Sequence, residues 1–180
     1  MSRFIRYIQK EDIRLFFMIN EGVKCKLFDK IMPVITHLGS AAVTISFALL
    51  IIILSKGSIT GPGWEIAASL TASHIIVQIM KKIINRLRPH QVLNDVNTFD
   101  IRLYSYSFPS GHTTAAFSIA GSIAFLFPGF TVLALSAAGL VGISRMYLGV
   151  HYPTDVLIGT LLGFASAFYV HKLFLFIQVM

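Results

Sequence analysis

The sequence predicts an all-α fold: an integral membrane helical bundle of about five transmembrane helices, preceded by an N-terminal interfacial amphipathic helix. The first observation is composition, because 55% of the 180 residues are hydrophobic and 13% are charged. Mean hydropathy is +0.74, well above the values usual for water-soluble domains. The second observation is a set of five apolar stretches that approach the ~30 Å length of a bilayer's hydrocarbon core. They cover residues 34–55, 64–80, 113–127, 130–146 and 156–179.

Residues 1–32 precede the first apolar stretch and have a mixed composition. Basic residues are interspersed there with bulky apolar ones, so the segment is too charged to span a membrane and too apolar to remain a free tail. Segments of this kind lie in the membrane interface. We therefore divide the chain into an interfacial amphipathic segment, residues 1–32, and a single transmembrane domain, residues 33–180.

The second apolar stretch is expected to continue as a helix beyond its hydrophobic part. Pro89 is the first helix breaker, so the helix should run from Trp64 to Arg88, which is ~37 Å at 1.5 Å per residue. The last two stretches carry small residues four positions apart, a spacing that lets membrane helices pack closely. These residues are Ala138, Gly142, Gly159 and Gly163.

Alternation of the five helices brings two connections to the same membrane face. One is the polar stretch 89–109, and the other is the short turn 147–152. Converging ionisable residues at a membrane face are a functional-site hypothesis by default. The residues that gather there are Lys81, Arg88, Ser110, His112, Arg145, His151 and Asp155.

Four of the converging residues, together with Gly111, favour binding of a phosphate group. Lys81 and Arg88 are seven positions apart, so on one helix they share a face, separated by ~10 Å along the axis, and both can reach one anion. Ser110 suits a helix N-cap and Gly111 lets a ligand approach the backbone amides that follow. Arg145 adds a guanidinium fork that matches paired phosphate oxygens.

The two histidines and the aspartate favour phosphoryl transfer. Asp155 follows His151 by four residues, and a carboxylate on one ring nitrogen leaves the other nitrogen free as a nucleophile. His112 is then the candidate general acid for the leaving oxygen. Carboxylates are too scarce at this face for a magnesium site, and the single cysteine, Cys25, excludes a Cys-rich zinc site. The residues therefore predict a phosphohistidine mechanism without metal or cofactor.

The remaining charged and histidine residues predict no second site. The formal net charge is +7, but the basic residues form no continuous run, so nucleic-acid binding is not expected. An anionic lipid or phosphate is the partner that fits this charge. His37 and His74 lie within or beside apolar stretches, and we interpret them as packing residues.

Three motifs, in order along the chain, resemble the type-2 phosphatidic acid phosphatase family of integral membrane lipid phosphatases, which is related to the vanadium haloperoxidases. The motifs are Lys81-x6-Arg88-Pro89, Pro109-Ser110-Gly111-His112 and Ser144-Arg145-x5-His151-x3-Asp155. The resemblance implies metal-independent hydrolysis of a phosphomonoester or diphosphate. It implies that His151 is the nucleophile, that Asp155 orients it and that His112 is the acid. The phosphate ligands that it implies are Lys81, Arg88, Ser110, Gly111 and Arg145. Family members commonly have six spans, and five are expected here.

The resemblance extends to both undecaprenyl-diphosphate phosphatases and phosphatidylglycerophosphate phosphatases. The small extramembrane mass favours undecaprenyl diphosphate, with phosphatidylglycerophosphate or phosphatidic acid as the alternative. A different class, a non-enzymic lipid-phosphate binder or translocator, would also suit a basic pocket at a membrane face. A binder or translocator would not account for the spacing of His151 and Asp155. The oligomeric state stays open.

Two observations disagree about the orientation of the site. All Lys and Arg residues except Lys56 and Lys172 fall on the catalytic side, which the positive-inside rule assigns to the cytoplasm. The family resemblance instead implies an active site on the extracytoplasmic face of a bacterial plasma membrane. We favour the second orientation. Lys81, Arg88 and Arg145 are expected on that side to bind phosphate, so they should not be counted as topology signals.

Overall fold

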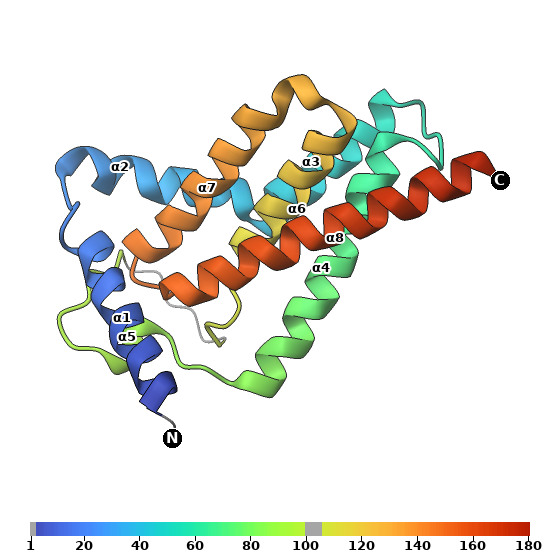
Figure 1. Cartoon of the computed structure of the whole chain (residues 1–180). Coiled ribbons are helices and arrows are strands. Elements are labelled where there is room, and N and C mark those ends of the chain that lie inside the picture. The colour runs from blue at the N-terminus through green and yellow to red at the C-terminus, as the bar shows by residue number, and fades with distance from the viewer. Residues whose placement is uncertain (1–2, 100–105) are drawn as a thin grey trace.

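The computed structural model describes residues 3–99 and 106–180, and these residues form helices without a strand. The chain runs from left to right and back several times in Figure 1. The helices are α1 (Arg3–Asn20), α2 (Lys26–Ile35), α3 (Ala41–Leu54), α4 (Pro62–Ile84), α5 (Pro89–Val92), α6 (Gly111–Leu126), α7 (Thr131–Tyr147) and α8 (Pro153–Val179), with short 3-10 turns at Thr36–Gly39 and Pro128–Phe130. The all-α prediction is confirmed.

Helices occupy all five apolar stretches, but not all of them have the length and hydropathy of a clear membrane span. Within the described residues two segments do, Pro128–Tyr147 and Pro153–Val179. A third span results if Lys26–Gly39 and Ala41–Leu54, which meet at an angle of 51°, are taken together. α3 has 14 residues and α6 has 16, and a bilayer span needs about 20. The number of five spans therefore stays a prediction.

The C-terminal end of α4 differs from the sequence prediction. The helix ends at Ile84 and not at Arg88, because Asn85 adopts a left-handed backbone with φ 49° and ψ 35°. Asn is one of the few residues that take this conformation readily. Arg88 is extended, as expected for a residue that precedes proline. Lys81 and Arg88 therefore do not share a helix face, and Arg88 reaches the site from a loop.

Helix α6 lies at the centre of the bundle, between α4, α7 and α8 (Figure 1). The small residues expected at helix contacts make these approaches possible. A Cβ atom on Gly159 would lie 2.8 Å from the Ser110 carbonyl oxygen, and one on Gly142 would lie 2.9 Å from a Val156 methyl group. Small residues thus set the distance between α6 and α8, and hence the position of the two helix ends that carry His112 and Asp155.

The N-terminal helix α1 packs on the loops at the end of the bundle that carries His112 and Asp155. Its last residue, Asn20, is buried, and its Nδ2 donates to the Tyr147 carbonyl at 2.7 Å and to the Asn97 carbonyl at 3.0 Å. Phe16 is also fully buried and contacts the ring of Tyr152. One face of α1 is therefore packed on the protein. The predicted boundary between residues 32 and 33 falls inside α2, and the placement of residues 1–32 in the interface stays a prediction.

Candidate active site

His151 lies in the turn between α7 and α8, and the first turn of α8 holds Asp155 beneath it. Tyr152 is the N-cap of α8 and Pro153 its first residue, so Asp155 occupies the position whose side chain can reach back to the cap. Its Oδ2 accepts from the Tyr152 amide at 2.8 Å. The same oxygen lies 3.5 Å from His151 Nδ1. The predicted pairing of His151 with Asp155 is thus built from adjacent turns of one chain segment.

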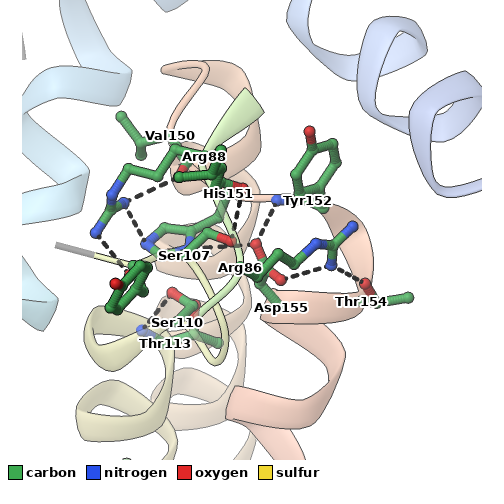
Figure 2. Close-up of polar contacts among 12 residues, drawn as sticks. Arg86, Arg88, Ser107, Ser110, Thr113, Val150, His151, Tyr152, Thr154 and Asp155 are labelled. Carbon is green, nitrogen blue, oxygen red and sulfur yellow. Dashed lines mark hydrogen bonds and ion pairs between the residues drawn. The ribbon is translucent and has the colours of Figure 1, made fainter. Parts of the chain in front are cut away.

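Arg88 contacts the other side of the His151 ring (Figure 2). Its Nη1 lies 3.1 Å from His151 Nε2 and 2.9 Å from the Val150 carbonyl oxygen. A guanidinium can only donate hydrogen bonds, so Nε2 must accept. We therefore assign the neutral tautomer with its proton on Nδ1, facing Asp155, and with a lone pair on Nε2. This is the tautomer that a nucleophilic histidine requires.

Burial, followed by the charges of Arg145, Arg88 and Lys81, holds the pKa of His151 well below its ordinary value of 6.5. The ring is almost completely buried, with 1% of its surface exposed. Protonation would place a cation in a dry site beside other cations, which is unfavourable. Burial also lowers the pKa of Arg88 to about 10, so the guanidinium keeps its charge at neutral pH. His151 is therefore a neutral imidazole surrounded by positively charged side chains.

The other predicted phosphate ligands lie around the same point. Lys81 Nζ donates to the Tyr106 carbonyl at 3.0 Å, and Arg88 Nη2 contacts the same oxygen at 3.3 Å. Arg145 Nη1 donates to Thr36 Oγ1 at 2.6 Å. Its Nε is buried and has no hydrogen-bond partner within the described part of the chain. A buried donor without a partner is costly unless a ligand satisfies it.

The start of α6 supplies the remaining predicted residues. Ser110 is the N-cap, and its Oγ accepts from the Thr113 amide at 3.4 Å. Around Gly111 there is room, since among the described residues a Cβ atom there would meet only a Val77 methyl group, at 3.8 Å. His112 follows as the second residue of the helix. The positive end of the α6 dipole therefore faces the cluster, as anion binding requires.

A second group of residues, which the sequence did not indicate, contacts Asp155 Oδ1, the carboxylate oxygen that does not face His151. Arg86 Nη1 donates to Asp155 Oδ1 at 2.7 Å, and its Nη2 to Asp12 Oδ2 at 2.6 Å. Asp12, from α1, also accepts from the Thr154 amide at 2.9 Å and from the Thr154 hydroxyl at 2.6 Å. Figure 2 shows Arg86 between Asp155 and Thr154. The guanidinium is further placed 3.9 Å from the Tyr152 ring centroid.

No spacing rule could have found this group, because Asp12 is 74 residues away from Arg86 along the chain. The one available signal was that Arg86 lies two residues before Arg88, in the part of the chain that was predicted to be the last turn of a helix at the site. The two histidines interpreted as packing residues are also placed differently. His37 and His74 are both exposed, so the packing interpretation is wrong for both. His74 instead contacts Gln78, with 3.2 Å between His74 Nε2 and Gln78 Nε2.

A cavity of about 520 Å³ opens beside the site, between α3, α4 and α6. Lys81, Gly111 and His112 line one end of it, and Thr44, Leu70 and Thr71 lie elsewhere along its wall. A cavity of this size is in the range of ligand sites.

Across residues 3–99 and 106–180, no three His, Cys, Asp or Glu side chains are grouped to hold a metal ion. The absence of a metal from the mechanism stays a prediction.

The PAP2 superfamily profile matches residues 62–178. The chain belongs to this family. The match covers α4 to α8, which carry Lys81, Arg88, Ser110, His112, Arg145, His151 and Asp155. The family resemblance inferred from three motifs is thereby confirmed, and the chain is an integral membrane PAP2 protein.

Among the curated relatives of this PAP2 protein, phosphatidylglycerophosphatase B of Bacillus subtilis is 34% identical over 79% of this chain and 73% of its own. The undecaprenyl-diphosphatase of Sulfolobus acidocaldarius is 28% identical over 91% of this chain and 81% of its own. The bacitracin transport permease protein BcrC of Bacillus licheniformis is 41% identical over 57% of this chain. That alignment spans only half of the relative, 50% of its length.

The fold is also that of a solved structure. The crystal structure of Aquifex aeolicus LpxE superposes with a TM-score of 0.80 and 30% sequence identity, over 89% of this chain and 94% of that one. The arrangement of helices described above is therefore shared along nearly the whole chain.

Proposed function

We propose that this PAP2 protein is a metal-independent phosphatase that hydrolyses a phosphomonoester or diphosphate of a membrane lipid. The observation that carries the proposal is the environment of His151. Its Nε2 accepts a hydrogen bond from Arg88 at 3.1 Å, and its Nδ1 faces Asp155. A neutral imidazole with its lone pair among phosphate-binding cations is the arrangement that nucleophilic attack on phosphorus needs.

The proposed first step forms a phosphohistidine. Burial, followed by the nearby cations, lowers the pKa of His112 to about 3, so the mechanism requires that the bound phosphate anion raises this pKa and that His112 is protonated in the complex. His151 Nε2 attacks the terminal phosphorus, the bond from phosphorus to the bridging oxygen breaks, and His112 gives its proton to that oxygen. Lys81, Arg88 and Arg145 stabilise the charge on the equatorial phosphate oxygens, as do the amides at the start of α6. Asp155 stabilises the positive charge that develops on the His151 ring.

The second step returns the enzyme to its starting state. The now neutral His112 removes a proton from water, and the hydroxide oxygen attacks the phosphorus of the phosphohistidine. The bond from phosphorus to Nε2 breaks, and inorganic phosphate leaves. His151 is neutral again and His112 is protonated again, so atoms and charges balance over the cycle.

Undecaprenyl diphosphate is the substrate that the sequence favours, and the name of the Sulfolobus relative supports it. The alternative, phosphatidylglycerophosphate or phosphatidic acid, is supported by the name of the Bacillus subtilis relative. Polar side chains on the cavity wall, Gln78 and His74, favour this alternative. A non-enzymic binder or translocator would leave the tautomer and pairing of His151 unexplained.

Phosphate release by the purified protein in detergent tests the proposal. The wild type should release phosphate from a lipid phosphate in excess EDTA, and His151→Ala should reduce the rate by at least about a thousandfold. His90→Ala is the matched control, since the ring of His90 contacts the Gly149 carbonyl, at 3.4 Å, and has no part in the mechanism. Unchanged release by His151→Ala, or a rate that disappears with EDTA and returns with magnesium, would contradict the proposal.

We further propose that the site faces the extracytoplasmic side of a bacterial plasma membrane. Cys25 is exposed, lies at the start of α2 and shares the catalytic end of the bundle. A membrane-impermeant maleimide should therefore label Cys25 in intact cells. In a Cys25→Ser background, a cysteine at Asn94 should be labelled and one at Ser58, in the α3–α4 connection, should not. Both positions are exposed. Labelling of Ser58→Cys alone would reverse the orientation.

A further inference from the structure

The cavity beside the active site extends far along α4. Lys81 and Thr71 both line it, and ten residues of helix correspond to ~15 Å. The phosphate-binding end is at Lys81, so the rest of the cavity is where the part of the lipid next to the phosphate must lie. The residues on this wall therefore contact the chemical group that distinguishes one lipid phosphate from another.

A row of polar side chains continues from Lys81 along this wall. Gln78 and His74 precede Lys81 by three and seven residues, so all three lie on one face of α4, and all three line the cavity. Gln78 is ~4.5 Å from Lys81 along the helix axis and His74 is ~10.5 Å from it. The row thus begins at the phosphate site and ends within the apolar stretch 64–80, which the sequence predicts to span the membrane.

The hydroxyl groups on the same wall are already satisfied by their own helices. Thr71 Oγ1 donates to the Ala67 carbonyl at 2.8 Å, Ser73 Oγ to the Leu70 carbonyl at 3.0 Å, and Thr44 Oγ1 to the Ser40 carbonyl at 2.9 Å. The Gln78 and His74 side chains are bonded to each other. One such bond leaves the amide with a further N–H donor and a carbonyl oxygen. In a predicted membrane span, exposed polar groups are costly in hydrocarbon, so a polar ligand group would stabilise them.

The position of the pair matches one class of lipid phosphate. In an acyl glycerolipid, ester carbonyls follow the phosphate after a single glycerol unit, so they would lie along α4 beyond Lys81. A polyprenyl diphosphate carries only hydrocarbon beyond its second phosphate. That second phosphate could reach Gln78, but it would leave His74 against an apolar chain.

We propose that Gln78 and His74 form a subsite for acyl ester carbonyls, and that the lipid phosphate hydrolysed by this protein is an acyl glycerolipid such as phosphatidic acid or phosphatidylglycerophosphate. The inference rests on the proposed function and selects its substrate class. Gln78 donates its free N–H to the carbonyl nearer the phosphate, and His74 orients Gln78 and donates to the second carbonyl.

Three lipids and two variants test the subsite in mixed micelles. The lipids are dioleoyl phosphatidic acid, its dialkyl ether counterpart, which lacks only the carbonyls, and undecaprenyl diphosphate. The wild type should have a kcat/KM about fivefold or more higher for the diester than for the diether, the worth of one net hydrogen bond. Gln78→Leu and His74→Leu should bring this ratio towards one by lowering the diester rate alone.

The matched control is Gln178→Leu, because Gln178 lies at the far end of α8, where it bonds the Thr60 carbonyl. It should leave the ratio unchanged. A wild-type ratio near one, a ratio that Gln78→Leu does not change, or faster hydrolysis of undecaprenyl diphosphate than of the diester would overturn the subsite. The wild-type ratio does not depend on the folding of any variant. No phosphate release from all three lipids would instead contradict the proposed function itself, and the subsite with it.

Discussion

The two sides of the His151 ring are built from different kinds of contact. On the Nδ1 side, Asp155 and Asp12 are ion-paired with Arg86 at 2.7 Å and 2.6 Å, and both carboxylates are buried. On the Nε2 side, Lys81 and Arg145 bond neutral oxygens, a backbone carbonyl and a threonine hydroxyl. On the first side both carboxylates are ion-paired within the protein and share one guanidinium. On the second side positive charge is in excess.

This difference assigns a task to each side. A buried network whose charges are paired holds one geometry with or without a ligand, so the Asp155 side positions the nucleophile in advance. Cations whose hydrogen-bond partners within the described residues are neutral oxygens keep a large part of their attraction for an anion. The Nε2 side is therefore complementary to a phosphate that is not part of the protein. Substitutions on the two sides should change different kinetic constants.

The largest effect on the positioning side is expected for Asp155→Asn. The amide cannot stabilise positive charge on His151, and its NH2 group would compete with the Nδ1 proton, so kcat should fall by about a thousandfold or more. KM should change little, because the cations that bind phosphate are untouched. Steady-state kinetics of the detergent-purified variant measures this, with its melting temperature as the control for folding. A change confined to KM would contradict the division of tasks.

Arg86 and Asp12 are expected to act as positioning residues with smaller effects. Arg86→Gln removes the two ion pairs with Asp155 and Asp12, each worth about tenfold to a hundredfold in rate at most. Asp12→Asn keeps an acceptor for the Thr154 amide, so its kcat should fall only several-fold. Arg86→Lys should recover part of the loss.

Glu11→Gln is the matched control for Asp12→Asn. It removes the same charge from the neighbouring position of α1, where Glu11 pairs with the exposed Arg14 at 3.6 Å. Its kcat should be that of the wild type. Equal losses for the two variants would mean that α1 acts through its total charge and not through the Asp12–Arg86 contact.

The pH dependence tests the neutral state of His151. The pKa of His151 is lowered from 6.5, chiefly by burial, and only the neutral ring can attack, so the acid limb of kcat/KM should lie below pH 6.5. The unfolded chain binds this proton more readily than the folded one, so stability should also decrease as the pH falls below 6.5. Two substrates with different phosphate pKa values separate substrate ionisation from that of the enzyme. An acid limb above pH 6.5 that is common to both substrates would contradict the assignment.

The sequence was sufficient for what depends on spacing and helix alternation. From it we predicted that Lys81, Arg88, His112, Arg145 and Asp155 lie at one end of a helical bundle, because each lies close to the end of an apolar stretch. It could not place the end of α4, since the left-handed conformation of Asn85 is a local choice that periodicity does not report. Arg86 and Asp12 were missed because their contact joins distant parts of the chain, and charge in residues 1–32 was assigned to the membrane surface.

The most direct test of the central claim is to trap the phosphoryl group on His151. A lipid carrying a radiolabelled terminal phosphate is mixed with excess purified protein and quenched in alkali, in which phosphohistidine persists. Label should appear on the peptide that contains His151 before free phosphate accumulates, and it should be absent from His151→Ala. Single-turnover release of phosphate without label on His151 at any quench time, or with label on another residue, would contradict the account.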